Sequence, residues 1–165
     1  MKALIYIFSI VLSQAFVTGC SQAGSSELKV IDYGLYKASN EASISDTNSP
    51  TGEVRSGGTF KLVEQSDTIS AKLGNAFGFR FSIPKELQQT QLKYVYSFPE
   101  MRNPNTGRSY TNFESLGGAK GHGPSSGIFY NLTDPWELVP GKWTIQVFVN
   151  DRKLLERQFT LVKAD

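Results

Sequence analysis

The stretch Phe77-Gly78-Phe79-Arg80-Phe81-Ser82-Ile83 places four large apolar residues at alternate positions, with glycine, arginine and serine between them. Successive side chains of a β-strand point to opposite faces, so this period of two predicts a strand that buries one face. The same alternation recurs in residues 92–98 and 143–149. These three segments predict a protein built from β-strands.

Shorter segments continue the pattern on both sides, at residues 28–38, 59–64, 110–114, 128–132 and 154–162. Adjacent Leu154 and Leu155 break the alternation in the last of these, which predicts a β-bulge or burial on both faces. Residues 39–52 and the glycine-rich residues 116–127 are expected to form loops, and residues 84–89 a single helical turn. About seven or eight strands without a long helix favour an antiparallel, immunoglobulin-like β-sandwich, with a small closed barrel as the alternative.

The amino end has the order of parts of a secretory signal peptide. Lys2 is followed by the apolar run of residues 3–12, and Ser13 and Gln14 then interrupt the run. A transmembrane helix needs about 20 mostly apolar residues, and this run is too short for one. We therefore expect a signal peptide at residues 1–19, a lipidated terminus and tether at 20–27, and a single sandwich domain at 28–165.

Cys20 closes the tetrapeptide Val17-Thr18-Gly19-Cys20, which resembles a bacterial lipobox. In that signal the cysteine becomes the first mature residue and carries acyl chains, including palmitate, that hold the protein on a membrane. We expect Cys20 to be lipidated and the protein to lie in the cell envelope. Ser21 follows it, which implies the periplasmic face of the outer membrane if the source is Gram-negative. A tether of seven residues reaches about 25 Å.

Composition narrows the function classes. The formal net charge is +2 and the basic residues are dispersed, so nucleic acid is a poor candidate partner. Cys20 is the only cysteine, so the domain has no internal disulfide. A single histidine, His122, cannot supply a zinc site, and its place in a glycine-rich segment favours an exposed loop residue. No cofactor is expected.

Several segments together resemble a bacterial family known only as domain of unknown function 3859. They are Tyr33-Gly34-Leu35-Tyr36, residues 67–74 running into Phe77-Gly78-Phe79-Arg80, Asn103-Pro104-Asn105-Thr106-Gly107, and residues 137–143 with Leu155 and Phe159 beyond them. The likeness spans most of residues 30–162. It implies the sandwich fold and an envelope role, and it brings no activity with it.

Candidate sites are few. Asp46 and Asn48 have the spacing of calcium ligands without the full loop, and residues 116–127 lack the ending of a phosphate-binding loop. Glu114, Asp134 and Glu137 could belong to a carboxylate pair, although surface positions are the default. Arg102 and Arg108 flank the Asn-Pro-Asn turn and are expected in solvent.

Four aromatic residues flank the glycine-rich segment: Tyr110, Phe113, Tyr130 and Trp136. Exposed aromatics would suit a glycan or peptide site, whereas core positions are favoured. We expect a non-catalytic envelope lipoprotein that binds a protein or glycan and is not an enzyme. The alternatives are a carboxylate- or metal-dependent hydrolase and a purely structural envelope component.

Overall fold

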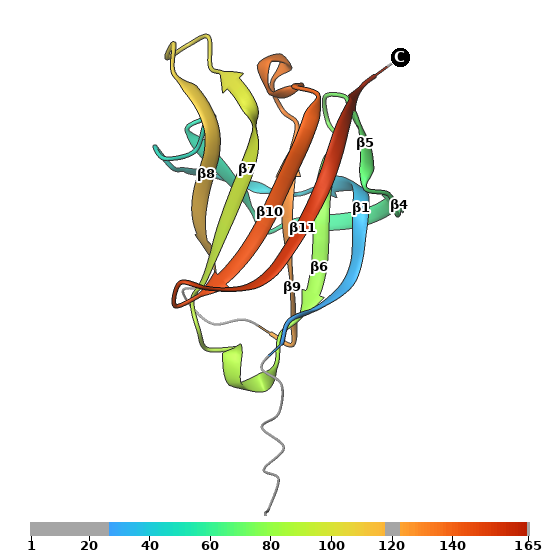
Figure 1. Cartoon of the computed structure of the whole chain (residues 1–165), viewed down its shortest axis with the longest axis vertical. Coiled ribbons are helices and arrows are strands. Elements are labelled where there is room, and N and C mark those ends of the chain that lie inside the picture. The colour runs from blue at the N-terminus through green and yellow to red at the C-terminus, as the bar shows by residue number, and fades with distance from the viewer. Residues whose placement is uncertain (1–26, 118–122, 165) are drawn as a thin grey trace, which may run out of the picture.

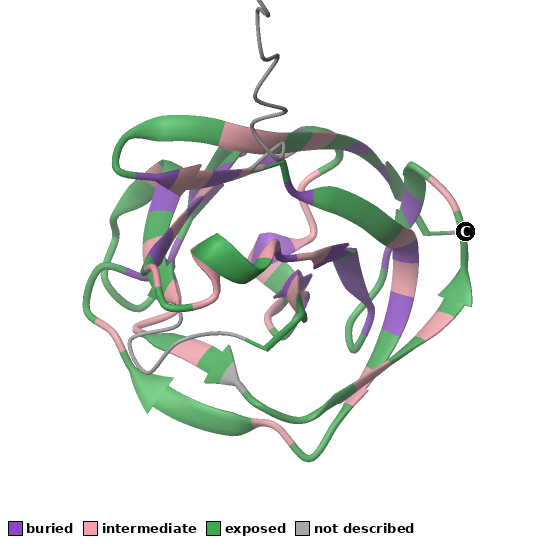
Figure 2. Cartoon of the chain, turned by 90° about the horizontal axis from the view of Figure 1, so that it is seen from below, coloured by how far each residue is buried: buried purple, intermediate pink, exposed green. Residues whose placement is uncertain are grey.

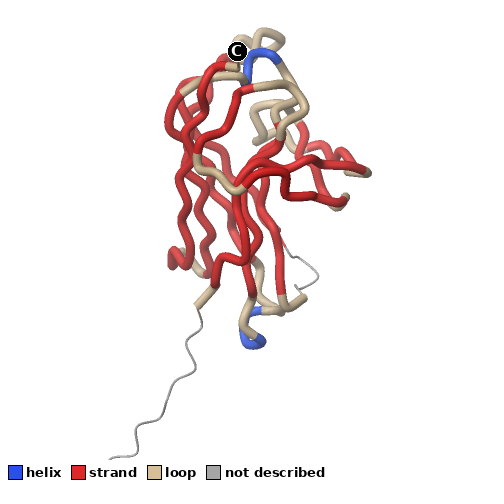
Figure 3. Tube along the Cα trace, turned by 90° about the vertical axis from the view of Figure 1, so that its right-hand side faces the viewer, coloured by secondary structure: helices blue, strands red, loops and turns tan. Residues whose placement is uncertain are grey.

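The computed structural model describes residues 27–117 and 123–164, and strands make up most of it (Figure 1). The strands in these two ranges are β1 (Lys29–Ser39), β2 (Ala42–Ser45), β3 (Glu53–Ser56), β4 (Thr59–Glu64), β5 (Thr68–Ala71), β6 (Ala76–Ser82), β7 (Leu92–Arg102), β8 (Ser109–Gly117), β9 (Ser125–Asn131), β10 (Gly141–Val149) and β11 (Arg152–Lys163). Two short 3₁₀ helices, η1 (Lys85–Leu87) and η2 (Pro135–Glu137), lie at opposite ends of the sandwich (Figure 3).

The strands form two stacked sheets. One has the order β4-β1-β6-β9 and the other β5-β11-β10-β7-β8, while β2 and β3 pair only with each other in a separate hairpin. All neighbours are antiparallel except β5 and β11, which run parallel. The β-sandwich is therefore confirmed. Among the described residues no strand of one sheet pairs with a strand of the other, so the alternative prediction of a small closed barrel is wrong.

Aromatic side chains fill the space between the sheets. Phe77, Phe79 and Phe81 point inward from β6, and Trp143 points inward from β10. The Trp143 ring lies 5.3 Å from the Phe77 ring, edge to face, so the two sheets meet through aromatic contacts. Figure 2, an end-on view, shows exposed residues around the outside of the molecule.

The predicted alternation is confirmed in the best-patterned strands. Every inward position of the 92–98 and 143–149 segments is buried, as is every apolar position of 77–83. The helical turn predicted at residues 84–89 is η1. The bulge is confirmed too: Val147 pairs with Leu155 and Phe148 with Lys153, which leaves Leu154 as the extra residue.

Three details differ from the expectation. The two main sheets hold nine strands, because the short β5 adds to the eight predicted segments, and residues 39–52 contain β2 rather than loop alone. Leu116 and Gly117 end β8, and residues 125–127 begin β9, so the predicted 116–127 loop is partly strand. The alternation of residues 28–38 predicts Ile31 on the same face as Tyr33 and Leu35, but the β1–β6 register shifts there and the Ile31 side chain is exposed.

The predicted signal peptide, Cys20 and most of the tether lie outside the described residues, as does His122. Within residues 27–117 and 123–164, no helix has the length and apolar character to cross a bilayer.

Candidate functional site

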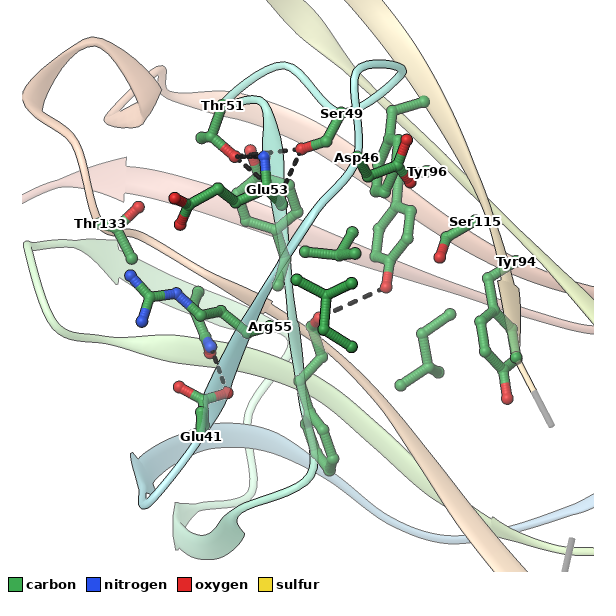
Figure 4. Close-up of a pocket in the computed structure, with 18 of the residues that line it drawn as sticks. Glu41, Asp46, Ser49, Thr51, Glu53, Arg55, Tyr94, Tyr96, Ser115 and Thr133 are labelled. Atoms are coloured by element: carbon green, nitrogen blue, oxygen red, sulfur yellow. Dashed lines mark hydrogen bonds between the residues drawn. The ribbon is translucent and has the colours of Figure 1, made fainter. Parts of the chain in front are cut away.

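A cleft of about 1070 Å³ lies on one side of the sandwich, where the edge strands β8 and β9 face the β2–β3 hairpin (Figure 4). β8 closes one sheet and β9 closes the other, and each pairs with a single neighbour among the described strands. The cleft volume lies slightly above the range of about 300–1,000 Å³ that is usual for ligand sites. We call it the edge cleft.

Tyrosines of β7 form the floor of the edge cleft. The Tyr96 ring stacks on Phe113 of β8 at 5.1 Å, and its hydroxyl donates to the backbone carbonyl of Phe129 in β9 at 3.3 Å. Tyr94 lies one step along on the same face of β7, because side chains two residues apart share a face. Burial raises the pKa of both tyrosines, so they stay neutral donors.

One end of the edge cleft is held by Glu137, whose side chain is buried. Its carboxylate accepts from the Tyr130 hydroxyl at 2.7 Å and from the backbone N–H groups of Thr133 and Asp134, each at 2.8 Å. Burial raises the pKa of Glu137, and these hydrogen bonds act against that rise. The hydrogen bonds of the carboxylate therefore stabilise the turn before η2.

The lining is strongly acidic. It contains six carboxylates and one guanidinium: Glu41, Asp46, Glu53, Glu114, Asp134, Glu137 and Arg55. The whole chain carries a formal charge of +2, so negative charge is concentrated at this cleft. The four ion pairs between described residues all lie elsewhere. No cleft carboxylate therefore forms an ion pair in the described part of the chain, although the pKa of Lys93, raised mainly by its hydrogen bond to Asp151, is also raised by the charge of Glu114.

The β2–β3 hairpin supplies one wall and is tied to the sandwich at two points. Asn131 of β9 donates through Nδ2 to Oε1 of Glu41 at 2.6 Å. In the turn of the hairpin, the Pro50 carbonyl accepts from Nδ2 of buried Asn103 at 2.8 Å. The hairpin therefore stands at a fixed place beside β8 and β9.

The structure separates the four aromatic candidates. Phe113 and Tyr130 line the edge cleft but are buried, so the favoured core positions are confirmed for them. Trp136 packs against the core outside the cleft. Tyr110 lies in a second hollow of about 250 Å³, together with Arg108. The structure does not bring the four residues together in one exposed site.

The carboxylate candidates for a catalytic pair or a metal site lie mainly in the edge cleft. Glu114, Asp134 and Glu137 all line the edge cleft, although Glu137 is occupied by its turn. Asp46 accepts from the backbone N–H of Asn48 at 2.9 Å, so the spacing of this pair serves a local turn. In the part of the chain that is described, no group of three or more histidine, cysteine or acidic side chains is arranged to hold a metal ion.

Sequence reasoning missed the hairpin contribution to the cleft. Glu41, Glu53 and Arg55 lie in a polar stretch whose strands are only four residues long. The sequence shows that these residues are charged. It has no periodic pattern in this stretch that would predict their position opposite β9.

Comparison with known proteins gives a family and a fold. A family model described as a domain of unknown function, DUF3859, matches residues 24–161. An immunoglobulin-like protein from Pseudomonas aeruginosa is similar in structure, with a TM-score of 0.58 and 24% sequence identity over 84% of this chain and 100% of that chain. This likeness supports the immunoglobulin-like fold.

A second solved structure is the alkylpurine DNA glycosylase AlkC from Pseudomonas fluorescens, bound to DNA that contains an abasic site analog. It matches 59% of this chain and 28% of that chain, with 19% identity and a TM-score of 0.31, so we draw nothing from it. The curated proteins contain no match to the chain.

Proposed function

The chain belongs to the DUF3859 family, a domain of unknown function, and from that premise we propose that it is a non-catalytic binding module of the bacterial cell envelope. The edge cleft is the binding surface in this proposal. The partner is a macromolecule of the envelope that enters between β8, β9 and the hairpin.

The observation that carries the proposal is the cleft itself, in which an aromatic floor is bordered by polar walls. Binding sites combine apolar lining with a few polar groups that fix orientation. Exposed Ile44 supplies apolar surface beside the buried rings of Tyr96 and Phe113, while Glu53 stands exposed on the hairpin wall. Glu137, the carboxylate with the raised pKa, already has four hydrogen bonds within its own turn and to Tyr130, which favours a structural part for it.

Lipidation of Cys20 would keep the module on a membrane. The first described strand begins at Lys29, so the tether between the acylated residue and the domain is short. A chain of this length reaches about 25 Å when fully extended. In this proposal the domain therefore stays close to the membrane surface that holds its anchor.

Site-specific photo-crosslinking in intact cells tests the proposal. A photo-reactive amino acid in place of Ser115, which lines the cleft, is expected to capture a discrete partner. The same amino acid in place of Gln158, exposed on β11 and outside the cleft, serves as the control. Equal crosslinking from both positions, or none from Ser115, would contradict a binding role for the cleft.

A further inference from the structure

We propose that the occupant of the edge cleft is an extended, cationic segment of a partner protein, which adds to the free edge of β9 as an extra strand. This inference rests on the proposed function and names the class of partner. It begins with the hydrogen-bonding groups of β9.

One edge of β9 has no neighbouring strand among the described residues. The strand pairs with β6 on its other side, and the carbonyl oxygen of Ile128 points at Gly78 of β6. In an antiparallel strand, alternate residues direct their N–H and C=O groups to opposite sides. Gly127, Phe129 and Asn131 therefore present theirs away from β6, toward the cleft.

At Phe129, one of these positions, a tyrosine side chain makes the hydrogen bond that a neighbouring strand would otherwise make. The carbonyl of Phe129 accepts from the Tyr96 hydroxyl, and the contact is long at 3.3 Å. Close by, the side-chain oxygen of Asn131 is buried and has no hydrogen-bond partner among the described residues. An incoming peptide N–H or ammonium group would satisfy such acceptors, whereas an unpaired buried acceptor costs free energy.

β9 also lacks the devices that usually protect an edge strand. Natural edges carry lysines, prolines or inward charges that discourage pairing. β9 reads SSGIFYN, without a charge or a proline. The edge β4 of the same sheet, by comparison, carries Lys61 and Glu64. Strand addition at an exposed edge gains affinity from main-chain hydrogen bonds and specificity from alternate side chains.

Charge identifies the kind of strand. Residues that point inward from an added strand would meet the aromatic floor of Tyr96 and Phe113. Those that point outward would face the hairpin wall and the carboxylate of Glu53, which forms no ion pair among the described residues. Complementary charge across an interface fixes register and rejects the wrong partners. The fitting segment alternates apolar residues with lysine or arginine.

Calorimetry on the full chain in detergent tests this with a defined probe. The probe is the acetylated, amidated peptide Lys-Val-Lys-Thr-Lys-Val-Lys, compared with the same peptide carrying glutamate for each lysine. We expect the cationic peptide to bind and the anionic one to bind at least about tenfold more weakly. Glu53→Lys, on the hairpin wall, should weaken binding by about fivefold or more. Glu86→Lys makes the same charge change on exposed η1, outside the cleft, and should leave binding unchanged.

Backbone methylation separates strand addition from simple charge attraction. Two further peptides carry N-methyl groups either on the lysines or on the residues between them. Because only alternate residues of an added strand direct their N–H groups to β9, one of these peptides should bind about tenfold more weakly than the other. The amides of Gly127, Phe129 and Asn131 should also exchange more slowly when the parent peptide is bound.

Absence of binding by the cationic peptide, or equal binding by both methylated forms, would overturn strand addition. Crosslinking from Ser115 is a separate readout: a partner captured there while the peptides fail would leave the proposed function standing and remove only this inference.

Discussion

Glu137 is a buried carboxylate whose hydrogen bonds hold the turn before η2. We expect Glu137→Ala to lower the free energy of unfolding by about 2–4 kcal/mol, because the Tyr130 hydroxyl and two backbone N–H groups lose their acceptor. Urea denaturation measures the change, with exposed Glu86→Ala as the control. A loss below about 0.5 kcal/mol, the range of a surface substitution, would mean that the carboxylate is not structural.

The same residue predicts a pH dependence. Burial raises the folded-state pKa of Glu137, so between the unfolded and folded pKa values the folded protein binds more protons. Stability therefore falls as pH rises through that window. The stability advantage of the wild type over Glu137→Gln should shrink as pH rises from about 4, near the ordinary pKa of glutamate. Unfolding curves of both proteins over a pH series measure this difference, and an advantage that grows with pH would contradict it.

At the scale of elements, Asn103 fixes the β2–β3 hairpin against the β7–β8 turn. Its Nδ2 donates to the Pro50 carbonyl, and its Oδ1 accepts from the backbone N–H of Asn105 at 2.8 Å. We expect Asn103→Ala to cost about 1–3 kcal/mol, because both bonds are lost at a buried position. It should also speed trypsin cleavage after Arg55 of β3, which limited proteolysis measures. Asn112→Ala, at an exposed position of β8, is the control, and unchanged cleavage in Asn103→Ala would show that the hairpin is held elsewhere.

The elements that the sequence predicts well are those with one buried face. Residues 77–83 and 143–149 alternate because one side contacts the core, and burial leaves a period of two. β2 leaves no such signal, since all four of its residues are exposed. β5 is equally short, and its parallel pairing with β11 depends on a segment some ninety residues away along the chain. Short strands of this kind form because they pair with another strand, and their own sequence is too short for an alternation to predict them.

The edge cleft was harder to predict than the fold. Its floor comes from β7 and β8, its edge from β9 and its acidic wall from the hairpin, so residues far apart in sequence meet there. The sequence does predict burial for Phe113 and Tyr130, both of which line the cleft. In the structure, the Ile128 carbonyl oxygen lies where a side chain at position 78 would stand, which explains the glycine there. The sequence alone does not predict this contact, because a glycine within a strand can also mark a bulge or a bend.

At the scale of the whole molecule, the charge distribution and the sheet edges coincide. The chain is close to neutral, yet its cleft carboxylates gather at β8 and β9, the strands with which the two sheets end in the described part of the chain. The opposite ends of the sheets are occupied by β4 and β5, so the molecule offers different edges on its two sides. A binding module anchored at its amino end would use this asymmetry to present one side to a neighbour.

The anchor itself gives the last prediction. If Cys20 is acylated, Cys20→Ser should abolish incorporation of labelled palmitate and leave the chain unprocessed, because only the thiol accepts the diacylglyceryl group. Each buried methylene contributes about 0.8 kcal/mol and one acyl chain binds only marginally, so loss of the full set should release any processed protein from the membrane. Metabolic labelling, intact mass and membrane fractionation measure the three effects, with Ser21→Ala as a neighbouring control. If the Cys20→Ser chain is still processed, labelled and membrane-bound like the wild type, attachment does not depend on this cysteine. The envelope proposal would then need another anchor.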